Sequence, residues 1–192
     1  NGERLGTALE WSDITGDKRQ EKIAAANARV KSALDGVTTN VMVADADLDI
    51  VYMNQSVQLM LADAESDLRK ELPHFDAKNL IGQNIDQFHK NPQHQRSMLS
   101  KLESTYRTQI EVGRRIFNLI ASPVFTDNNE KIGFVVEWAD VTLQVETEKE
   151  VEKLVTSVAQ GNLGALVSTD NKEGFFLNIA NGLNDLSQTV NA

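Results

Sequence analysis

Hydrophobic and polar residues alternate in five short stretches of this chain, and this alternation predicts five β-strands. Two of the stretches lie within Asn40–Asn54, on either side of a polar Asp-Ala-Asp-Leu-Asp run, and predict a hairpin. Three more lie within residues 104–113, 114–126 and 130–142, and a polar turn at Asp127–Glu130 joins the last two. Short polar connections favour antiparallel neighbours in one sheet.

Between the hairpin and the last three strands, the pattern changes to a helical one. Val57, Leu61, Ala64 and Leu68 have helical spacing, and we expect Pro73 to stop that helix. A turn broken by glycine, a short helical piece and a helix from Pro92 follow; the apolar residues expected on one face of this last helix are Met98, Leu99 and Leu102. This order predicts an α+β fold: a five-stranded antiparallel sheet with helices on one face.

Two further helices flank this unit. Residues 16–36 are rich in Ala, Lys, Arg and Glu without Pro, and Ile23, Val30 and Val37 lie seven residues apart with alanines between them. A second stripe follows the unit and consists of Val141, Val145, Val151, Leu154, Val155 and Val158. Narrow apolar seams of this kind favour dimeric coiled coils that carry signals between modules, and the alternative is an amphipathic helix lying on its own domain.

An internal repeat indicates how the chain begins. Asn1–Thr15 matches Asn128–Thr142, with Gly, Glu-Trp, Asp and Thr identical in the same register. The same structural unit therefore occurs twice in the parent protein. We expect residues 1–15 to be the last strand of an upstream unit, and the chain, which begins without Met, to be a segment of a longer protein.

Composition and missing motifs exclude several function classes. A formal charge of -9 argues against nucleic acid or an anionic membrane as partner. The absence of cysteine excludes thiolate metal sites, thioether-linked haem and flavin–cysteinyl adducts. Asp45, Asp47 and Asp49 lack the glycine and distal glutamate of a calcium loop, and the chain has no G-x-S-x-G or phosphate-binding motif. We therefore expect a non-enzyme, in the cytoplasm, without membrane contact.

Several motifs resemble a known family. The order of elements, with "IVYMN", "LIG" and a closing D-V-T, resembles the PAS domains of bacterial chemoreceptors. "LRKELPHFDAKNLIGQNIDQFHKNPQHQRSML" and "IASPV…GFVVEWADVT" resemble the haem-binding PAS domains of soluble Aer-type aerotaxis receptors, which are methyl-accepting chemotaxis proteins. The resemblance implies an upstream PAS strand at 1–15, a linker helix at 16–36, the PAS domain at 37–142 and a signalling helix at 143–160. Residues 161–192 resemble the start of a HAMP signal-relay module.

The resemblance also implies a cofactor and its site. The family binds haem b; by position, His89 is its axial iron ligand, Leu119 an apolar pocket residue and Trp138 the tryptophan of the last strand. His94 is expected at the periphery of the site. The implied partners are O2, with CO and NO as further gases, a second copy in a homodimer, and the HAMP and kinase-control module of the same chain, with a histidine kinase and an adaptor reached indirectly.

The chemistry of these residue types agrees with this reading. Ferrous haem needs one neutral imidazole and an open position for gas. O2 becomes partly negative when bound, and an indole N–H can only donate a hydrogen bond. Core packing is the alternative role for Trp138 and Leu119. Alternative functions are a PAS relay without cofactor and a sensor with noncovalent flavin. We also expect Asp140 or Thr142 to cap the signalling helix.

Overall fold

The structure is a computed structural model that describes residues 15–89, 91–160 and 165–191, and it divides into two compact units, Asn1–Val37 and Thr38–Ala192. The described part of the first unit is dominated by helix α1, Thr15–Asp35, where the sequence predicts a linker helix. Ile23 and Val30 are exposed on α1, whereas Val37 lies beyond its end. The predicted upstream strand at 1–15 lies, except for Thr15, outside the described residues.

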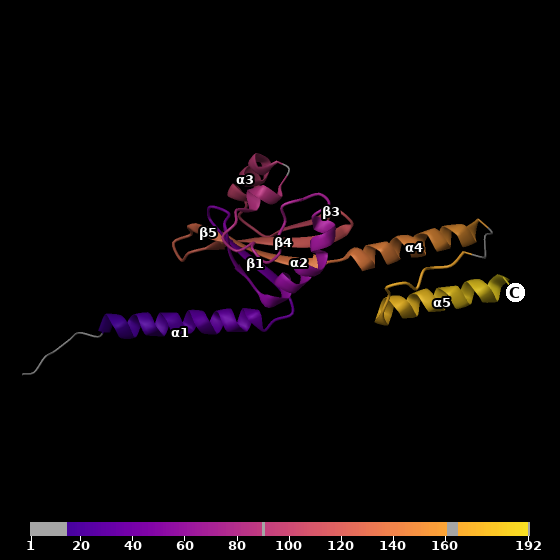
Figure 1. Cartoon of the computed structure of the whole chain (residues 1–192), viewed down its shortest axis with the longest axis horizontal. Helices are drawn as coiled ribbons and strands as arrows, with labels where there is room; N and C mark the ends of the chain where they lie inside the picture. The colour runs from indigo at the N-terminus through magenta and orange to yellow at the C-terminus, as the bar shows by residue number, and fades with distance from the viewer. Residues whose placement is uncertain (1–14, 90, 161–164, 192) are drawn as a thin grey trace, which may run out of the picture. The chain divides into compact units, whose positions relative to one another are not determined.

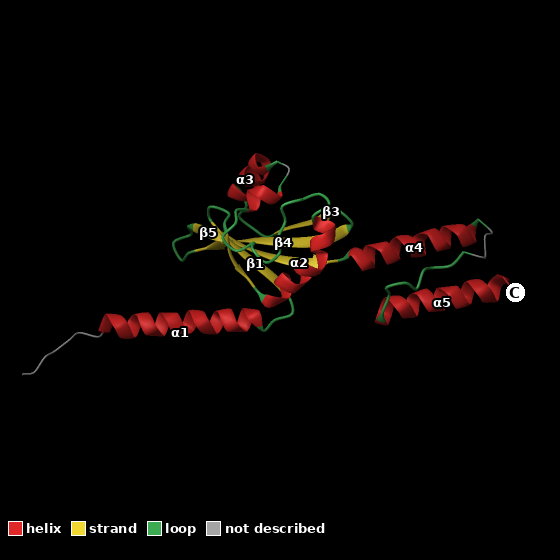
Figure 2. Ribbon diagram, in the orientation of Figure 1, coloured by secondary structure: helices red, strands yellow, loops and turns green. Residues whose placement is uncertain are grey.

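The second unit is built on the predicted five-stranded antiparallel sheet (Figures 1 and 2). Its strands are β1 Asn40–Asp45, β2 Ile50–Met53, β3 Tyr106–Val112, β4 Arg115–Phe125 and β5 Lys131–Asp140. Their order across the sheet is β2-β1-β5-β4-β3, so the last strand lies in the centre, paired with β1 and β4. The predicted fold class and all five strands are confirmed.

Three helical segments cross from β2 to β3: α2 Gln55–Leu68, the 3-10 helix η1 Ile85–Phe88 and α3 Pro92–Ser100. Val57, Leu61, Ala64 and Leu68 are the buried residues of α2, as their spacing predicts. Helix α2 ends at Leu68 rather than at Pro73, because the chain continues as turns in which Leu72 N–H donates to Leu68 O and Phe75 N–H to Leu72 O. Leu102 follows α3 instead of lying on it.

The core lies between these helical segments and one face of the sheet. Phe117 and Trp138 contact the α2 cluster, while Phe134 packs with Leu99 of α3 and with Leu48. Phe134 and Trp138 lie four residues apart in β5 and therefore on the same face, so α2 and α3 cover one side of the sheet. Gly133, the glycine shared with the N-terminal repeat, lies against β1: a Cβ there would come within 2.2 Å of Ala44 O.

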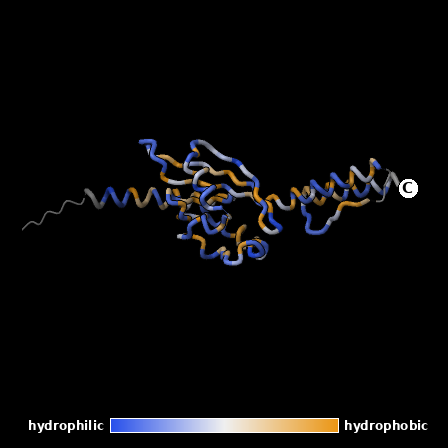
Figure 3. The backbone as a smooth tube through the Cα atoms, turned by 90° about the horizontal axis from the view of Figure 1, so that it is seen from above, coloured by the Kyte–Doolittle hydropathy of each residue, from blue (hydrophilic) through white to orange (hydrophobic). Residues whose placement is uncertain are grey.

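After the sheet, helix α4 Thr142–Ala159 and helix α5 Gly174–Asn191 follow. Among the residues between them, Val167 exchanges two hydrogen bonds with the Asn184 side chain, and Ala165 O accepts from Ser187. Lys172, farther along the same segment, pairs with Glu150 of α4 at 2.9 Å. This connector therefore runs back along both helices, and α4 and α5 point the same way (Figure 1). Hydrophilic and hydrophobic residues alternate along both helices (Figure 3).

Candidate functional site

His89 directly follows η1, and a main-chain contact favours one tautomer of its ring. Its Nδ1 lies 2.8 Å from the carbonyl oxygen of Ile85. A carbonyl oxygen only accepts, so Nδ1 carries the hydrogen, and the lone pair of the neutral imidazole is on Nε2. This is the arrangement that metal-ligating histidines commonly have, with the second ring nitrogen held by a main-chain carbonyl. The ring is half-buried.

Trp138 lies near the end of the central strand β5 and faces the core. It is opposite Leu119 of β4, and its ring meets Phe117 edge-on at 5.7 Å. The indole Nε1 is buried and has no hydrogen-bond partner among the described residues. Since an unmade hydrogen bond of a buried donor costs about 1–3 kcal/mol, this nitrogen is a candidate donor to a bound group.

Partly buried apolar side chains pack against the same core cluster as Trp138. Leu119 and Trp138 belong to a set of partly buried residues around the main core cluster, whose other members are Met60, Leu72, Ile85, Phe88, Ile110 and Val112. These residues come from α2, η1, the three C-terminal strands and the turn after α2. A buried donor among partly buried apolar side chains is compatible with an apolar ligand that has a polar centre.

The remaining histidines lie elsewhere on the surface. His94 is exposed near the start of α3, where its main-chain N–H donates to Asn91. His74 is exposed in the turns after α2. Within the described residues, no group of three or more His, Cys, Asp or Glu side chains is arranged to hold a metal ion. Haem iron needs no such group, because the porphyrin supplies four of its ligands and one imidazole suffices as the fifth.

A charged junction connects the sheet to α4. Arg115 of β4 pairs with Asp140 at 2.8 Å, with Asp67 of α2 at 3.1 Å and with the exposed Asp63 at 3.0 Å. Burial alone would lower the pKa of Arg115, but its three carboxylate partners raise it. Burial alone would likewise raise the pKa of Asp140; hydrogen bonds from Thr142 and Arg115 overcome this and hold it below its ordinary value.

The same junction fixes how α4 begins. Asp140 Oδ1 accepts from the main-chain N–H of Thr142, the first residue of α4, at 2.9 Å. The predicted cap is therefore present in Asp140, although Val141 occupies the N-cap position without a side-chain bond. Thr142 differs from the prediction: its Oγ1 accepts from Ile116 N–H of β4 rather than from its own helix. The start of α4 is thus held by two strands.

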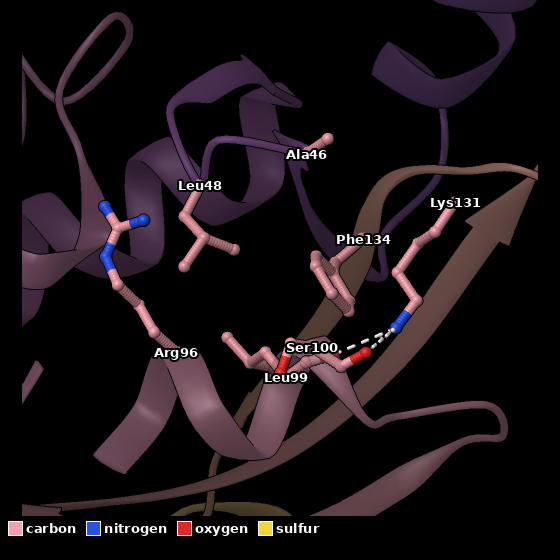
Figure 4. A pocket seen from close by; sticks show the side chains of 7 residues that line it. All are labelled: Ala46, Leu48, Arg96, Leu99, Ser100, Lys131 and Phe134. Atoms are coloured by element: carbon pink, nitrogen blue, oxygen red, sulfur yellow. Dashed lines mark hydrogen bonds between the residues drawn. The ribbon is translucent and has the colours of Figure 1, made fainter. Parts of the chain in front are cut away.

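A separate cavity of about 330 Å³ lies at the opposite end of β5 (Figure 4). Its lining residues are Ala46, Leu48, Arg96, Leu99, Ser100, Lys131 and Phe134. Lys131 Nζ donates to the carbonyl oxygens of Leu99 and Ser100, and Arg96 pairs with Asp86 at 2.6 Å. The cavity contains none of the predicted site residues.

Sequence reasoning did not single out Asn40 or Ser56, which lie close to Trp138 in space. Asn40 is the residue of β1 paired with Trp138, 98 positions away in the chain, and Ser56 contacts Asn40. A polar residue at the first position of a predicted strand was the only available signal. Sequence reasoning also missed Arg115, because its three partners lie far from it in the chain, on α2 and β5.

Comparisons with known proteins agree with this architecture. A sequence-family model described as a PAS domain matches residues 28–92. The methyl-accepting chemotaxis protein McpB of Pseudomonas aeruginosa is 50% identical over 188 residues; the alignment covers 98% of this chain and 27% of McpB. The chain thus spans about a quarter of that relative. Within the described residues, no helix combines the length and apolarity needed to cross a membrane.

A solved structure is similar to about half of this chain. It belongs to the Aer2 receptor of Vibrio cholerae, described as a dual PAS-heme oxygen sensor. It is 37% identical, with a TM-score of 0.50, and the match covers 54% of this chain and 95% of that one. Together with the strand order of the sheet, these findings show that the chain carries a PAS domain and is homologous to a methyl-accepting chemotaxis protein.

Proposed function

We propose that this PAS domain binds haem b and senses O2, and that it relays gas binding through α4 in a chemoreceptor. The buried indole N–H of Trp138, which has no acceptor among the described residues, carries the proposal. Such a donor in an apolar setting fits a polar ligand that is absent from the protein itself. The Vibrio relative described as a PAS-heme oxygen sensor supports the same reading.

The residues present fit haem. His89 would hold the iron through Nε2, because its Nδ1 hydrogen is given to Ile85 O and this fixes both tautomer and ring direction. Leu119 and the other partly buried apolar residues would contact the porphyrin. His94, exposed on α3, would stay peripheral. When bound, haem supplies an iron with one open position for a diatomic gas.

Trp138 would select among gases. Its N–H donates to a ligand that carries partial negative charge, such as O2, and gains less from the less polar CO. Leu119, directly opposite in the sheet, offers no hydrogen bond and keeps the surroundings of the indole apolar. The preference for O2 over CO would therefore depend on the indole of Trp138.

The signal would leave through the strand that carries Trp138. Asp140 lies two residues farther along β5, where it binds Arg115 and the first N–H of α4. A displacement of Trp138 is passed to this junction because both residues share one strand. We propose that α4, the connector and α5 form a HAMP-like relay. It would act in a homodimer and control a histidine kinase, with an adaptor, through the rest of the receptor.

The test is the absorption spectrum of the purified protein, reduced and mixed with hemin, and then exposed to O2 and to CO. We expect a Soret band that shifts with each gas, is lost in His89→Ala and persists in His94→Ala, the control. A band retained in His89→Ala would reject this ligand. A colourless protein that ignores hemin would indicate a relay without cofactor, and a flavin spectrum would indicate a redox sensor.

Trp138→Leu tests gas selection. Loss of one hydrogen bond to the gas should weaken O2 binding by about twofold to tenfold, since such bonds contribute about 0.5–1.5 kcal/mol. CO binding should change much less. Equal losses for both gases, measured by laser-flash recombination, would show that Trp138 acts by packing alone.

A further inference from the structure

Asn40 connects the main chain of Trp138 to helix α2. Its Nδ2 donates to the carbonyl oxygen of Trp138 at 3.0 Å and lies 3.3 Å from Met60 Sδ of α2. Asn40 and Trp138 are also the terminal pair of the β1–β5 ladder, which runs from there to Asp45 and Gly133. Ladder ends open more readily than ladder centres, so a side-chain bond at this point restrains Trp138 where the ladder is weakest.

Ser56 fixes the other end of the Asn40 amide. The Ser56 hydroxyl lies 2.7 Å from Asn40 Oδ1 and 2.8 Å from the carbonyl oxygen of Thr38. A hydroxyl carries one hydrogen, and both of these oxygens accept, so the two contacts compete for it. Whether the Ser56 hydroxyl donates to Asn40 therefore depends on the position of Thr38, the first residue of the second unit.

The neighbouring Asn54 holds the same segment. This residue is fully buried, and its side chain accepts from Val41 N–H and Val57 N–H and donates to Thr39 O. Residues 38–41 are thereby attached to the start of α2 at several points. We therefore expect a movement of this segment to reach Ser56 and Asn40.

The orientation of the indole depends on such main-chain restraints. Its N–H has no partner among the described residues, so packing against the core cluster, including the edge contact with Phe117, and the direction of its own Cα–Cβ bond hold the ring. The bond from Asn40 holds the peptide plane that follows Trp138 and thus the backbone from which the ring projects. Without this side-chain bond, the Trp138 carbonyl keeps only its pairing at the end of the β1–β5 ladder, and we expect a wider range of ring orientations.

We propose that Asn40 is a positioning residue for Trp138, and that through Ser56 it makes the indole sensitive to the segment entering the PAS domain at Thr38–Asn40. For the gas ligand, this inference rests on the proposed function. It adds a second direction of coupling. The segment before β1 would change the orientation of the Trp138 indole, and the junction at Asp140 would pass a displacement of Trp138 to α4.

The first test needs no haem. In the whole chain with Trp11→Phe, Trp138 is the single tryptophan, and its time-resolved fluorescence anisotropy reports ring motion. Asn40→Asp keeps the acceptor for Ser56 but loses the donor to Trp138; we expect faster and wider ring motion. Ser56→Ala should give a smaller change in the same direction. Asn118→Asp is the matched control, since Asn118 is exposed on β4 and its Oδ1 accepts from Gln109.

The second test uses the haem-loaded protein. Asn40→Asp should weaken O2 binding about twofold, less than Trp138→Leu does, while leaving the Soret band and CO affinity nearly unchanged, because it loosens one hydrogen-bond donor without removing it. Anisotropy of Asn40→Asp equal to that of Asn118→Asp, or equal losses of O2 and CO affinity, would overturn the proposal. A parent protein that binds no haem would reject the proposed function, and the anisotropy result would still decide the role of Asn40.

Discussion

The PAS domain and the helical segment after it differ in how completely they cover their apolar side chains. In the PAS domain, Val57, Leu61 and Phe117 are at most 2% exposed, within one continuous cluster. In the helical segment, the cluster of buried residues is Leu154, Val167 and Ala180, whereas Val155 and Leu186 are 58% and 60% exposed. The PAS domain has one continuous covered core, and the helical segment has a small one beside exposed apolar side chains that a second copy could cover.

The largest expected effect is Leu61→Ala in the centre of the PAS core. Removing three carbons from a fully covered site should destabilise the domain by about 2–5 kcal/mol. Leu154→Ala, the matched change in the helical segment, should leave the PAS transition in place. Chemical unfolding is followed by Trp138 fluorescence in the Trp11→Phe background and by circular dichroism at helical wavelengths.

These two variants test whether the regions are separate. Leu154→Ala could lower the midpoint of unfolding followed by Trp138 fluorescence as much as Leu61→Ala does. In that case, the helices and the domain unfold as one cooperative unit, and their difference in packing does not correspond to separate stabilities.

A buried ion pair gives the next largest effect. The side chain of Lys172 is 3% exposed and pairs with Glu150, which is 34% exposed. Glu150→Ala leaves a buried ammonium without its carboxylate, and a partly exposed partner reduces the usual penalty to roughly 1–3 kcal/mol. The loss of stability is measured by circular dichroism at helical wavelengths during heating. Glu150→Gln, which keeps a hydrogen-bond acceptor for Lys172, is the control. An unchanged melting curve in Glu150→Ala would mean that Lys172 reaches water.

The pair can also be replaced as a whole. Lys172→Met with Glu150→Leu should restore the stability lost in Glu150→Ala, because apolar side chains of similar size remove the desolvation cost of both charges. A double variant as unstable as the single one would indicate that the charges hold the connector in register.

The fold could be predicted from sequence because its signals are local. The alternation over Asn40–Asn54 and the spacing of the α2 core residues each lie within one element, and both are confirmed. The end of α2 was wrong because no local rule weighs Pro73 against a series of turns that ends the helix earlier. The burial of Lys172 was equally invisible, since it depends on a connector folding back on α4.

The candidate site was accessible only through family resemblance. No property of His89 in the sequence separates it from His94; their difference lies in the contact with Ile85 and in exposure. In the sequence, Trp138 reads as one more apolar core residue. That its indole nitrogen has no partner among the described residues can be seen only in the packed core. Asn40 required the strand register, which joins residues 98 positions apart.

Acid should weaken the junction between the two regions by a smaller amount. The pKa of Asp140 lies below its ordinary value, so its contribution is present above the unfolded pKa of about 3.9 and is lost as the pH falls through the lower folded pKa. The amide NMR signals of Ile116 and Thr142 should therefore change in strongly acidic solution. Asp140→Asn should remove most of this response; a full response there would point to Asp67, whose pKa is lowered by Lys70 and Arg115.

The smallest effect on folding is expected from Val155→Ser. Because Val155 is 58% exposed on α4, its replacement should change the stability of a single chain by less than about 0.5 kcal/mol. Its effect should instead be on self-association: if a second copy covers this face, the serine variant shifts the monomer–dimer equilibrium toward monomer in sedimentation across a dilution series. Lys149→Ser, an exposed polar change on the same helix, is the control. Identical sedimentation of the two variants would mean that the exposed apolar side chains of α4 do not join copies, and that the helical segment does not differ from the PAS domain in needing a second copy.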